Sequence, residues 1–448
     1  MKKILALVLN NFELFLFLAL SPVVWAYYTS RNQQEKEGIK AIDKAVKTQT
    51  NEPLSLHPEI DPALCAGCGA CTKVCPEGDI LKLVNHKAVL VAPTKCVGHG
   101  ECEQACPFEA ISLVFGTKTR GQDIPRLNSN YETNVPGLYI AGELGGMGLI
   151  RNAVKQGIAA VEDALAKKTG GPEAQFDVLI VGAGPAGVAG AMAATARKAK
   201  YAVIEQNSFG GTIANFPRQK VVMSHPAVLP LAGVMKFAKN KVSKEELLEY
   251  WGGLRSKYAL NIVENAKFNA LTVSDGVFQV DTSRGVMTAK KVILAMGVRG
   301  SPRRLGLPNE DLPKVTYNLL DPEQYQNCHV AVVGGGNAGV EAAQYLAKAQ
   351  YKNKVTLLVR GATFDRCNEE NQNIINEMEK KGLVEIWYES SIKEIQPDKL
   401  VIQRKDGSVE IPNNYLFVFA GAEMPHKFLM SLGIQIDKKF GEALGKAG

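Results

Sequence analysis

Residues 65–76 read CAGCGACTKVCP, and this stretch decides the fold of the region around it. Residues 96–107 read CVGHGECEQACP, so the same pattern of cysteines and a closing proline returns 31 residues later. His99 stands where the first copy has Cys68. The two stretches are therefore an internal repeat that brings seven cysteines and one histidine together in a short segment.

The spacing C-x2-C-x2-C-x3-C-P is the iron-sulfur motif of bacterial ferredoxins. Seven cysteines cannot all pair as disulfides, and paired C-x2-C zinc sites need neither the third cysteine nor the proline. Residues 56–116 thus resemble a two-cluster ferredoxin. In that family the last cysteine of each copy reaches across to the other cluster, which implies one ligand set of Cys65, Cys68, Cys71 and Cys106, and a second of Cys75, Cys96, Cys102 and the position of His99.

His99 makes the second cluster the unusual one. A neutral imidazole in place of an anionic thiolate would leave a 4Fe-4S cluster less negative and raise its reduction potential. Alternatively, the site holds a 3Fe-4S cluster without this ligand, or His99 is solvated beside a degenerate site. The ligand type alone does not decide between the three.

The composition fits a large globular protein. A chain of 448 residues is long enough for two to four domains. The net charge of +7 is modest, and no basic stripe with interleaved aromatic residues occurs. We therefore expect no nucleic-acid partner.

The N-terminal sequence suggests a membrane anchor. Residues 4–28 are largely apolar, and as a helix they would cross a bilayer with some tilt. We predict a transmembrane helix over residues 1–28 and a polar stalk over residues 29–55; a cleaved signal peptide is the competing interpretation. Positive charges after the span outnumber those before it, which places the large domain on the cytoplasmic side.

A first glycine-rich loop follows a short apolar strand at residues 176–181. The loop reads Gly182-Ala-Gly184-Pro-Ala-Gly187 and opens an alanine-rich helix, and the next strand, residues 201–204, ends in Glu205. In this context the glycines permit a tight turn, a close approach of the pyrophosphate and helix packing on the strand. The stretch predicts a dinucleotide site.

The same pattern recurs after the strand at residues 329–333. Here the loop is Gly334-Gly-Gly336-Asn337-Ala-Gly339, so the chain has two nucleotide sites. The following strand ends in Arg360 rather than an acid, and an arginine there can receive a 2′-phosphate. We therefore predict NADPH rather than NADH.

Residues 176–425 resemble the thioredoxin-reductase-like flavoproteins. The resemblance implies FAD on the first loop and NADPH on the second, inserted one. The expected fold is α/β, with two dinucleotide-binding, Rossmann-like domains (176–300 for FAD, 301–421 for NAD(P)H), a return to the FAD domain over 422–448, the small α+β ferredoxin domain and the transmembrane helix. The implied FAD residues are Gly182, Gly184, Gly187, Glu205, Gln206, Gly211, Thr212 and Asn215. The implied NADP residues are Gly334, Gly336, Asn337, Gly339, Arg360 and Gly421.

One segment of that family stands out of order in this chain. The C-terminal closing segment of the FAD domain, T-x-V-P-G-L-Y-x-A-G-D, resembles residues 133–143, upstream of the first glycine loop. The flavoprotein thus looks circularly permuted, with residues 117–168 as the displaced part. This resemblance adds five FAD residues: Gly142, Glu143, Arg151, Asn152 and Ala153.

A second departure concerns the redox-active thiols. The C-x-x-C of thioredoxin reductases is absent, and Cys328 and Cys367 stand alone, so a dithiol relay is not expected. We predict a membrane-anchored oxidoreductase that moves electrons between NAD(P)H, FAD and the clusters to a one-electron acceptor, with the cofactors rather than catalytic side chains carrying the reaction. The alternatives are a subunit of a larger membrane redox complex and a ferredoxin-linked disulfide reductase. Expected partners are a cytochrome, a ferredoxin, a quinone-linked subunit or a second copy of the chain.

Overall fold

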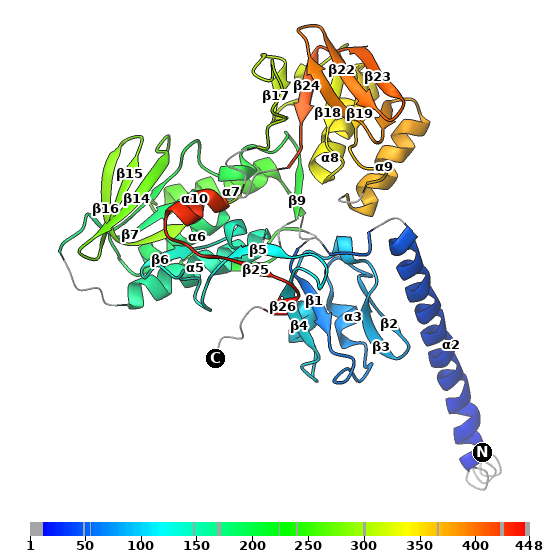
Figure 1. Cartoon of the computed structure of the whole chain (residues 1–448). Coiled ribbons are helices and arrows are strands. Elements are labelled where there is room, and N and C mark those ends of the chain that lie inside the picture. Colours follow the sequence, from blue (N-terminus) through cyan, green and yellow to red (C-terminus); the bar gives the residue numbers. More distant parts are fainter. Residues whose placement is uncertain are drawn as a thin grey trace. The chain divides into compact units, whose positions relative to one another are not determined.

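The computed structural model describes residues 12–47, 50–53, 55–146, 148–167, 172–223, 225–238, 241–298, 302–364, 367–421 and 425–443. These residues belong to two compact units (Figure 1). Unit 1 runs as far as Leu113 without residues 54–56, and unit 2 comprises those residues and the chain from Val114 onward.

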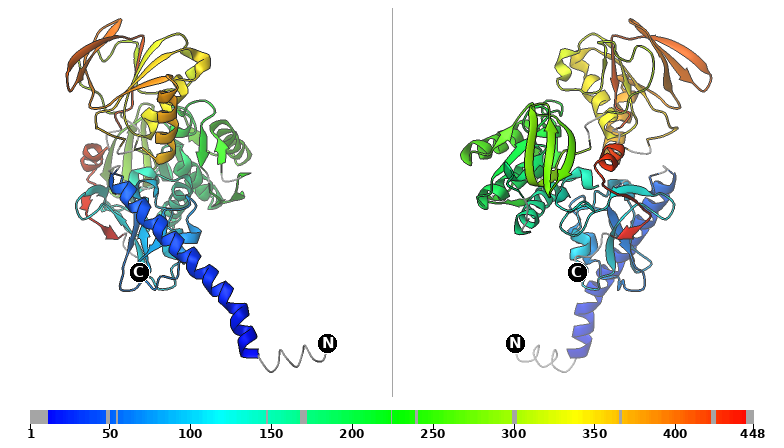
Figure 2. Two further views of the ribbon diagram at one scale, coloured as in Figure 1. Left: turned by 90° about the vertical axis from the view of Figure 1, so that its right-hand side faces the viewer. Right: turned by 60° about the vertical axis from the view of Figure 1, so that its left-hand side comes forward.

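The predicted membrane anchor is wrong. Helix α2 (Phe12–Lys47) has 36 residues, and residues 1–11 lie outside the described residues. Both views of Figure 2 show α2 as one continuous helix. No helix in the described part of the chain is long and apolar enough to cross a membrane. The cytoplasmic orientation was inferred from the charges that flank this anchor, so that prediction is wrong as well.

The second half of α2 packs on the cysteine-rich part of unit 1. Gly38 is buried, and a Cβ at this position would come within 2.8 Å of Val84 Cγ2. Glu37 accepts a hydrogen bond from Lys82 Nζ at 3.0 Å, and Glu35 accepts one from the Asn85 backbone N–H at 2.8 Å. Residues 29–47, which we expected in a stalk, are therefore helical and packed on a hairpin of unit 1.

The rest of unit 1 is small and follows the sequence repeat. The hairpin pairs β2 with β3 in antiparallel fashion, from Leu81 opposite Leu90 to Val84 opposite Lys87. Gly69 and Gly100 precede the two short helices with positive φ angles of 77° and 87°, a conformation that favours glycine, so both copies of the repeat start their helix in the same way. The elements are β1 (His57–Ile60), α3 (Ala70–Val74), β2 (Leu81–Val84), β3 (Lys87–Leu90), α4 (Glu101–Gln104) and β4 (Ile111–Phe115).

Unit 2 contains the sheet of the predicted FAD domain. Its strand order is β13-β8-β7-β16-β15-β14, and β6 pairs with β16 on the side of the sheet. The ladders from β13 to β16 and between β16 and β6 are parallel, whereas β14, β15 and β16 are antiparallel. The strands are β6 (Leu138–Ile140), β7 (Phe176–Val181), β8 (Tyr201–Ile204), β13 (Ile262–Val263), β14 (Phe268–Ser274), β15 (Val277–Thr282) and β16 (Gly285–Leu294).

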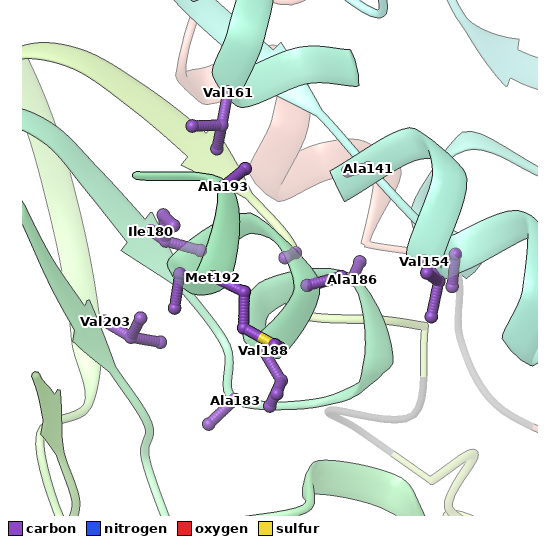
Figure 3. Close-up of a cluster of buried hydrophobic side chains, with 14 of the residues drawn as sticks. Ala141, Val154, Val161, Ile180, Ala183, Ala186, Val188, Met192, Ala193 and Val203 are labelled. Atoms are coloured by element: carbon purple, nitrogen blue, oxygen red, sulfur yellow. The ribbon is translucent and has the colours of Figure 1, made fainter. Parts of the chain in front are cut away.

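Residues 117–168, the segment predicted to be displaced and called the displaced segment below, contribute to this domain's core. Strand β6 pairs with β16 from Leu138 opposite Val292 to Ile140 opposite Leu294. Helix α5 (Ile150–Ala166) packs against α6 (Pro185–Ala196), the helix that follows the first glycine loop. Figure 3 shows the shared apolar cluster, in which side chains of the displaced segment lie beside those of β7, α6 and β8.

An insertion between β8 and β13 completes this half of unit 2. It consists of two antiparallel pairs, β9 with β12 and β10 with β11, and of helix α7, which starts with a capping box between Ser243 and Glu246. The bounds are β9 (Val221–Met223), β10 (Ala227–Leu229), β11 (Gly233–Met235), β12 (Lys241–Ser243) and α7 (Lys244–Lys257).

The nucleotide domain downstream has its own parallel sheet, with strand order β17-β24-β18-β19-β20 and an antiparallel β21-β22-β23 sheet beside it. Buried apolar residues of this sheet and its helices form a cluster of their own. The elements are β17 (Val315–Thr316), β18 (His329–Val333), α8 (Asn337–Leu346), β19 (Lys354–Leu358), α9 (Glu369–Lys380), β20 (Val384–Trp387), β21 (Ser391–Ile395), β22 (Lys399–Arg404), β23 (Gly407–Pro412) and β24 (Tyr415–Val418).

The C-terminal residues return to the first half of unit 2. Leu429 of α10 (His426–Ser431) and Ile434 are buried in the core of the FAD-domain sheet. Strand β25 (Ile436–Lys439) then pairs with β5 (Gln122–Pro125), and β26 (Glu442–Ala443) pairs with the end of β4. Arg126 also makes a bidentate ion pair with Asp437, at 3.0 and 2.7 Å. The link after the ferredoxin segment is thus a paired strand.

Candidate functional site

The first cysteine cavity gathers ligands from both copies of the repeat. Cys65, Cys68 and Cys71 line a cavity together with Cys106. The cavity walls are otherwise apolar, and backbone N–H groups of Ala88 and Ala110 point at the sulfur atoms of Cys65 and Cys106, each at 3.4 Å. The structure therefore brings together the first predicted ligand set.

The second cavity mirrors the first with one change of donor. Cys75 comes from the first copy of the repeat, and Cys96, His99 and Cys102 come from the second; together they line a cavity. The crossing over of Cys75 and Cys106 between the two halves was predicted by the family resemblance, and the structure reproduces it.

His99 is buried at this second cavity. Its side chain is 6 % exposed, and Nε2 lies 3.6 Å from Oε1 of Glu77. A carboxylate beside one ring nitrogen orients the imidazole and leaves the other nitrogen to serve as a ligand. The burial contradicts the alternative of a solvated histidine.

The cysteine thiols of both cavities lie in surroundings that favour the protonated form until a metal binds. Burial, together with the neighbouring Cys65, Cys68 and Cys106, raises the pKa of Cys71 to about 11. Burial likewise raises the pKa of Cys96 to about 11 and of Cys102 to about 12. Such thiols become thiolates when they bind a metal, so the donor sets fit iron-sulfur clusters. Among the described residues, no three His, Cys, Asp or Glu side chains gather as closely as a single metal ion requires.

The first glycine loop has a cradle at the N-terminus of α6. Gly182 has a φ of 109°, and a Cβ there would lie 2.5 Å from the Ala295 carbonyl oxygen. A Cβ on Gly184 would meet nothing within 4 Å, and one on Gly187 would overlap the carbonyl oxygen of Gly182. The turn, the open approach and the close packing are the three roles predicted from the sequence, and they fit a pyrophosphate at the helix N-terminus.

Other predicted FAD residues surround this loop. Gly211 lies against Gly184, because a Cβ on Gly211 would come within 3.2 Å of the Gly184 Cα. The Glu205 carboxylate is buried and accepts hydrogen bonds from the backbone N–H groups of Ala183 at 2.9 Å and Asn207 at 3.0 Å. Glu205 therefore holds the glycine loop itself, a contact that the sequence did not suggest. Gln206 is exposed, Thr212 lies in the 3-10 turn Gly211–Ile213, and Asn215 follows that turn.

The displaced segment reaches the same helix terminus. A Cβ on Gly142 would lie 3.3 Å from Ala186 Cβ and 3.7 Å from Ala153 Cβ. The Gly142 N–H donates to Oε1 of Gln156 at 2.7 Å, and Gln156 is only 2 % exposed. Sequence reasoning missed Gln156, although a glutamine on the alanine-rich face of a helix was a signal. Glu143 begins the 3-10 turn that follows, and Arg151 and Asn152 lie in the first turn of α5.

The second glycine loop repeats the geometry of the first. Gly334 has a φ of 137°, and a Cβ on Gly339 would overlap the carbonyl oxygen of Gly334. Gly336 caps α8, and Gly421 has a φ of 94° with open space at its Cβ position. Arg360 is exposed just after β19. The residues present fit a second dinucleotide.

Polar side chains of α9 hold the start of α8. Asn337 Oδ1 accepts hydrogen bonds from the Asn368 N–H at 2.8 Å and from Asn371 Nδ2 at 3.3 Å. Asn371 Nδ2 also donates to Glu341 Oε1 at 3.0 Å, and Lys220 Nζ pairs with Glu341 Oε2 at 2.5 Å. No predicted site residue other than Asn337 belongs to this network.

The two remaining cysteines lie in the nucleotide domain. Cys367 is 1 % exposed, and burial raises the pKa of its thiol to about 12. Cys328 is partly exposed and donates its S–H to the Gln326 carbonyl at 3.1 Å. The high pKa of Cys367 makes it a poor nucleophile.

Comparison with known proteins matches two parts of the chain. Residues 179–444 match the family described as pyridine nucleotide-disulphide oxidoreductase, and residues 57–107 match the 4Fe-4S dicluster domain. The chain is 27 % identical over 273 residues to the bacilliredoxin reductase Bdr of Bacillus subtilis, covering 60 % of this chain and 83 % of that protein. It is 29 % identical over 266 residues to a ferredoxin–NADP reductase of Ignicoccus hospitalis, covering 59 % and 83 %.

The fold of the flavoprotein part also has a counterpart among solved structures. The bacillithiol disulfide reductase Bdr of Staphylococcus aureus has a TM-score of 0.54 and 22 % identity to this chain, covering 59 % of this chain and 82 % of that one. At 22 % sequence identity, this similarity is evidence for the fold alone. It confirms the predicted α/β flavoprotein architecture.

Proposed function

The chain belongs to the pyridine nucleotide-disulphide oxidoreductase family and carries a 4Fe-4S dicluster domain, and we propose that it transfers electrons between NADPH and a one-electron redox protein. Bound FAD would exchange hydride with the nicotinamide and single electrons with the clusters. The protein's own residues bind and orient these groups through two glycine loops and two cysteine cavities.

One observation carries the proposal. Each cysteine cavity is completed by a cysteine from the other copy of the repeat, Cys106 for the first and Cys75 for the second. A two-cluster ferredoxin uses this crossing so that both clusters share one small core. A dithiol relay from NADPH needs neither cavity, whereas a protein that exchanges single electrons can use both.

We propose that the FAD domain is circularly permuted. The pairing of β6 with β16 and the packing of α5 on α6 support this, since residues 138–166 precede the first glycine loop in the chain but belong to its core. The family match begins only at residue 179, after this segment. Gly142, Glu143 and the first turn of α5 would then line the FAD site together with the first glycine loop.

For the second cluster we propose a 4Fe-4S centre with His99 as a ligand. The buried position of His99 among three cysteines and its contact with Glu77 support a ligand role. A 3Fe-4S cluster is the alternative. Low-temperature EPR of the oxidised protein separates them, because a three-iron signal would exclude His99 as the ligand of a fourth iron.

The variant Cys106→Ala tests the proposed route of electrons through the clusters. This variant should keep its FAD and still oxidise NADPH with a two-electron acceptor, but lose most reduction of a one-electron acceptor such as cytochrome c. The matched control is Cys328→Ala, which removes a partly exposed cysteine outside the repeat. Electron delivery by Cys106→Ala at the wild-type rate would contradict the proposal.

Disulfide reduction is the second candidate, favoured by the bacilliredoxin reductase to which the chain is similar. The burial and raised pKa of Cys367 speak against it. Alkylation of Cys328 followed by assays with disulfide and one-electron acceptors decides between the two functions. Loss of only the disulfide activity would favour this candidate.

A further inference from the structure

A chain of hydrogen bonds runs from Glu341, in the middle of α8, to Asn337 at its first residue. The intermediary is Asn371 of α9, which is 8 % exposed. Its Nδ2 donates to Glu341 Oε1 at 3.0 Å and to Asn337 Oδ1 at 3.3 Å. The backbone of Asn371 is held as well, because its N–H donates to Asn368 Oδ1 and its carbonyl accepts from Gln344.

The carboxylate of Glu341 sets which group donates and which accepts along this series of hydrogen bonds. An ionised Glu341 can only accept hydrogen bonds, so Asn371 must turn its amide nitrogen toward it. Because Asn371 Nδ2 also faces Asn337, Asn337 accepts this hydrogen bond with Oδ1. The Asn368 N–H, at 2.8 Å, is a second donor to the same oxygen. Because Oδ1 of Asn337 faces α9, its Nδ2 faces away from α9.

Asn337 lies where an anion would bind. It follows Gly336, the cap of α8, and its side chain is exposed at the N-terminus of that helix. An oxygen at this position would repel a phosphate, whereas an amide N–H would bind it. The end of Asn337 that is turned away from α9 therefore decides whether the residue helps or hinders a nucleotide.

We propose that Glu341 and Asn371 are positioning residues for the nicotinamide nucleotide, because their hydrogen-bond chain fixes Asn337 with its amide nitrogen available to the pyrophosphate. This rests on the proposed use of the second glycine loop for NADPH. Lys220 stabilises the charged end of the chain through its ion pair with Glu341.

The first test is Glu341→Gln, measured as NADP⁺ binding to the purified full-length protein by calorimetry. With Lys220 donating to it, a glutamine presents its oxygen to Lys220 and its NH₂ to Asn371, which reverses the chain. We expect about fivefold weaker binding, the loss of about one net hydrogen bond. Removing a negative charge near a phosphate would by itself strengthen binding. Glu370→Gln, which neutralises an exposed acid on α9, is the control for that charge effect.

The second test separates orientation from structural support. Asn371→Asp sets two carboxylates against each other and should lower the melting temperature. Adding Glu341→Gln restores a donor and an acceptor at this contact, so the double variant should recover stability. Its aspartate only accepts, however, and draws the Nδ2 of Asn337 toward α9. Binding of NADP⁺ should therefore stay at least fivefold weaker than in the wild type.

The outcomes are distinct. Weak binding by a stable double variant, with no loss of binding in Glu370→Gln, supports the proposal. Wild-type affinity in Glu341→Gln, or recovery of both stability and binding in the double variant, overturns it while leaving the nucleotide site intact. A wild-type protein that binds no NADP⁺ would overturn the proposed function and this inference together.

Discussion

Gly157 of α5 lies directly against the backbone carbonyl of Ala186 in α6, so the displaced segment and the helix of the first glycine loop touch without an intervening side chain. A Cβ at Gly157 would overlap this oxygen, and Gly190 lies in the same contact, where a Cβ would come within 3.2 Å of Val161 Cγ2. Ala186 is one residue before the third glycine of the loop. The fit of α5 therefore bears directly on the shape of the predicted FAD site.

Gly157→Val should force the two helices apart. We expect a loss of about 1–3 kcal/mol in the free energy of unfolding and reduced FAD content, because overpacked contacts force backbone shifts. Urea unfolding followed by flavin release measures both effects. The control is Gly252→Ala in α7, where a Cβ would meet nothing within 4 Å. It should stabilise the protein by about 0.5–1 kcal/mol. Full FAD retention in Gly157→Val would refute the role assigned to this contact.

His99→Cys should complete the second cysteine set. A thiolate adds negative charge where the imidazole was neutral, so the reduction potential of the second cluster should fall, by an amount on the order of 100 mV. A redox titration followed by EPR measures the change, and the signal of the first cluster is the internal reference. An unchanged potential for both clusters would show that His99 does not bind the iron.

Arg360→Glu should change the nucleotide preference. An acid at the end of β19 would repel a 2′-phosphate, so the KM for NADPH should rise about tenfold or more while the KM for NADH changes little. Steady-state kinetics with both nucleotides measures this. Lys354→Glu, an exposed residue at the other end of β19, makes the same change of charge and should leave the preference as it was.

Asp163 makes the stability of the displaced segment depend on pH. Burial alone would raise its pKa, but hydrogen bonds from Lys167 and Tyr139 outweigh burial and lower it. A lowered pKa stabilises the fold above the unfolded value of about 3.9, and this contribution disappears as the pH falls through the lower, folded value.

Asp163→Asn should therefore be less stable than the wild type at pH 7, by about 1 kcal/mol, and the difference should shrink below about pH 4. Urea unfolding at pH 7 and pH 3.5 measures the two values. Glu162→Gln, next to it but largely exposed, is the control and should show no such difference. An equal deficit for Asp163→Asn at both pH values would argue against this ion pair.

Local sequence patterns predicted the parts of the fold that depend on neighbouring residues. The glycine loops have the backbone conformation that their sequence predicted, because Gly182 and Gly334 adopt positive φ angles that only a glycine adopts readily. The two ligand cavities followed from the repeat, because each copy folds into the same turn and short helix.

Contacts between distant residues were not predictable in this way. The apolar N-terminal run suggested a separate anchor, but α2 continues through the polar residues beyond Tyr28 and packs on the hairpin that contains Val84. Asn371 gave no signal either, since its role depends on Asn337 and Glu341 on another helix. Such pairings depend on tertiary packing, which overrides local preference.

The pairing of β5 with β25 also bears on the order in which the protein is made. Arg126 and Asp437, which join these strands, are 311 residues apart in the chain. Domains fold as they leave the ribosome, so the cysteine repeat can fold before residues 436–439 exist. Until residues 436–439 are synthesised, β5 lacks the strand with which it pairs. The link that follows the ferredoxin segment can therefore form this pairing only late in synthesis, after the cysteine repeat has folded.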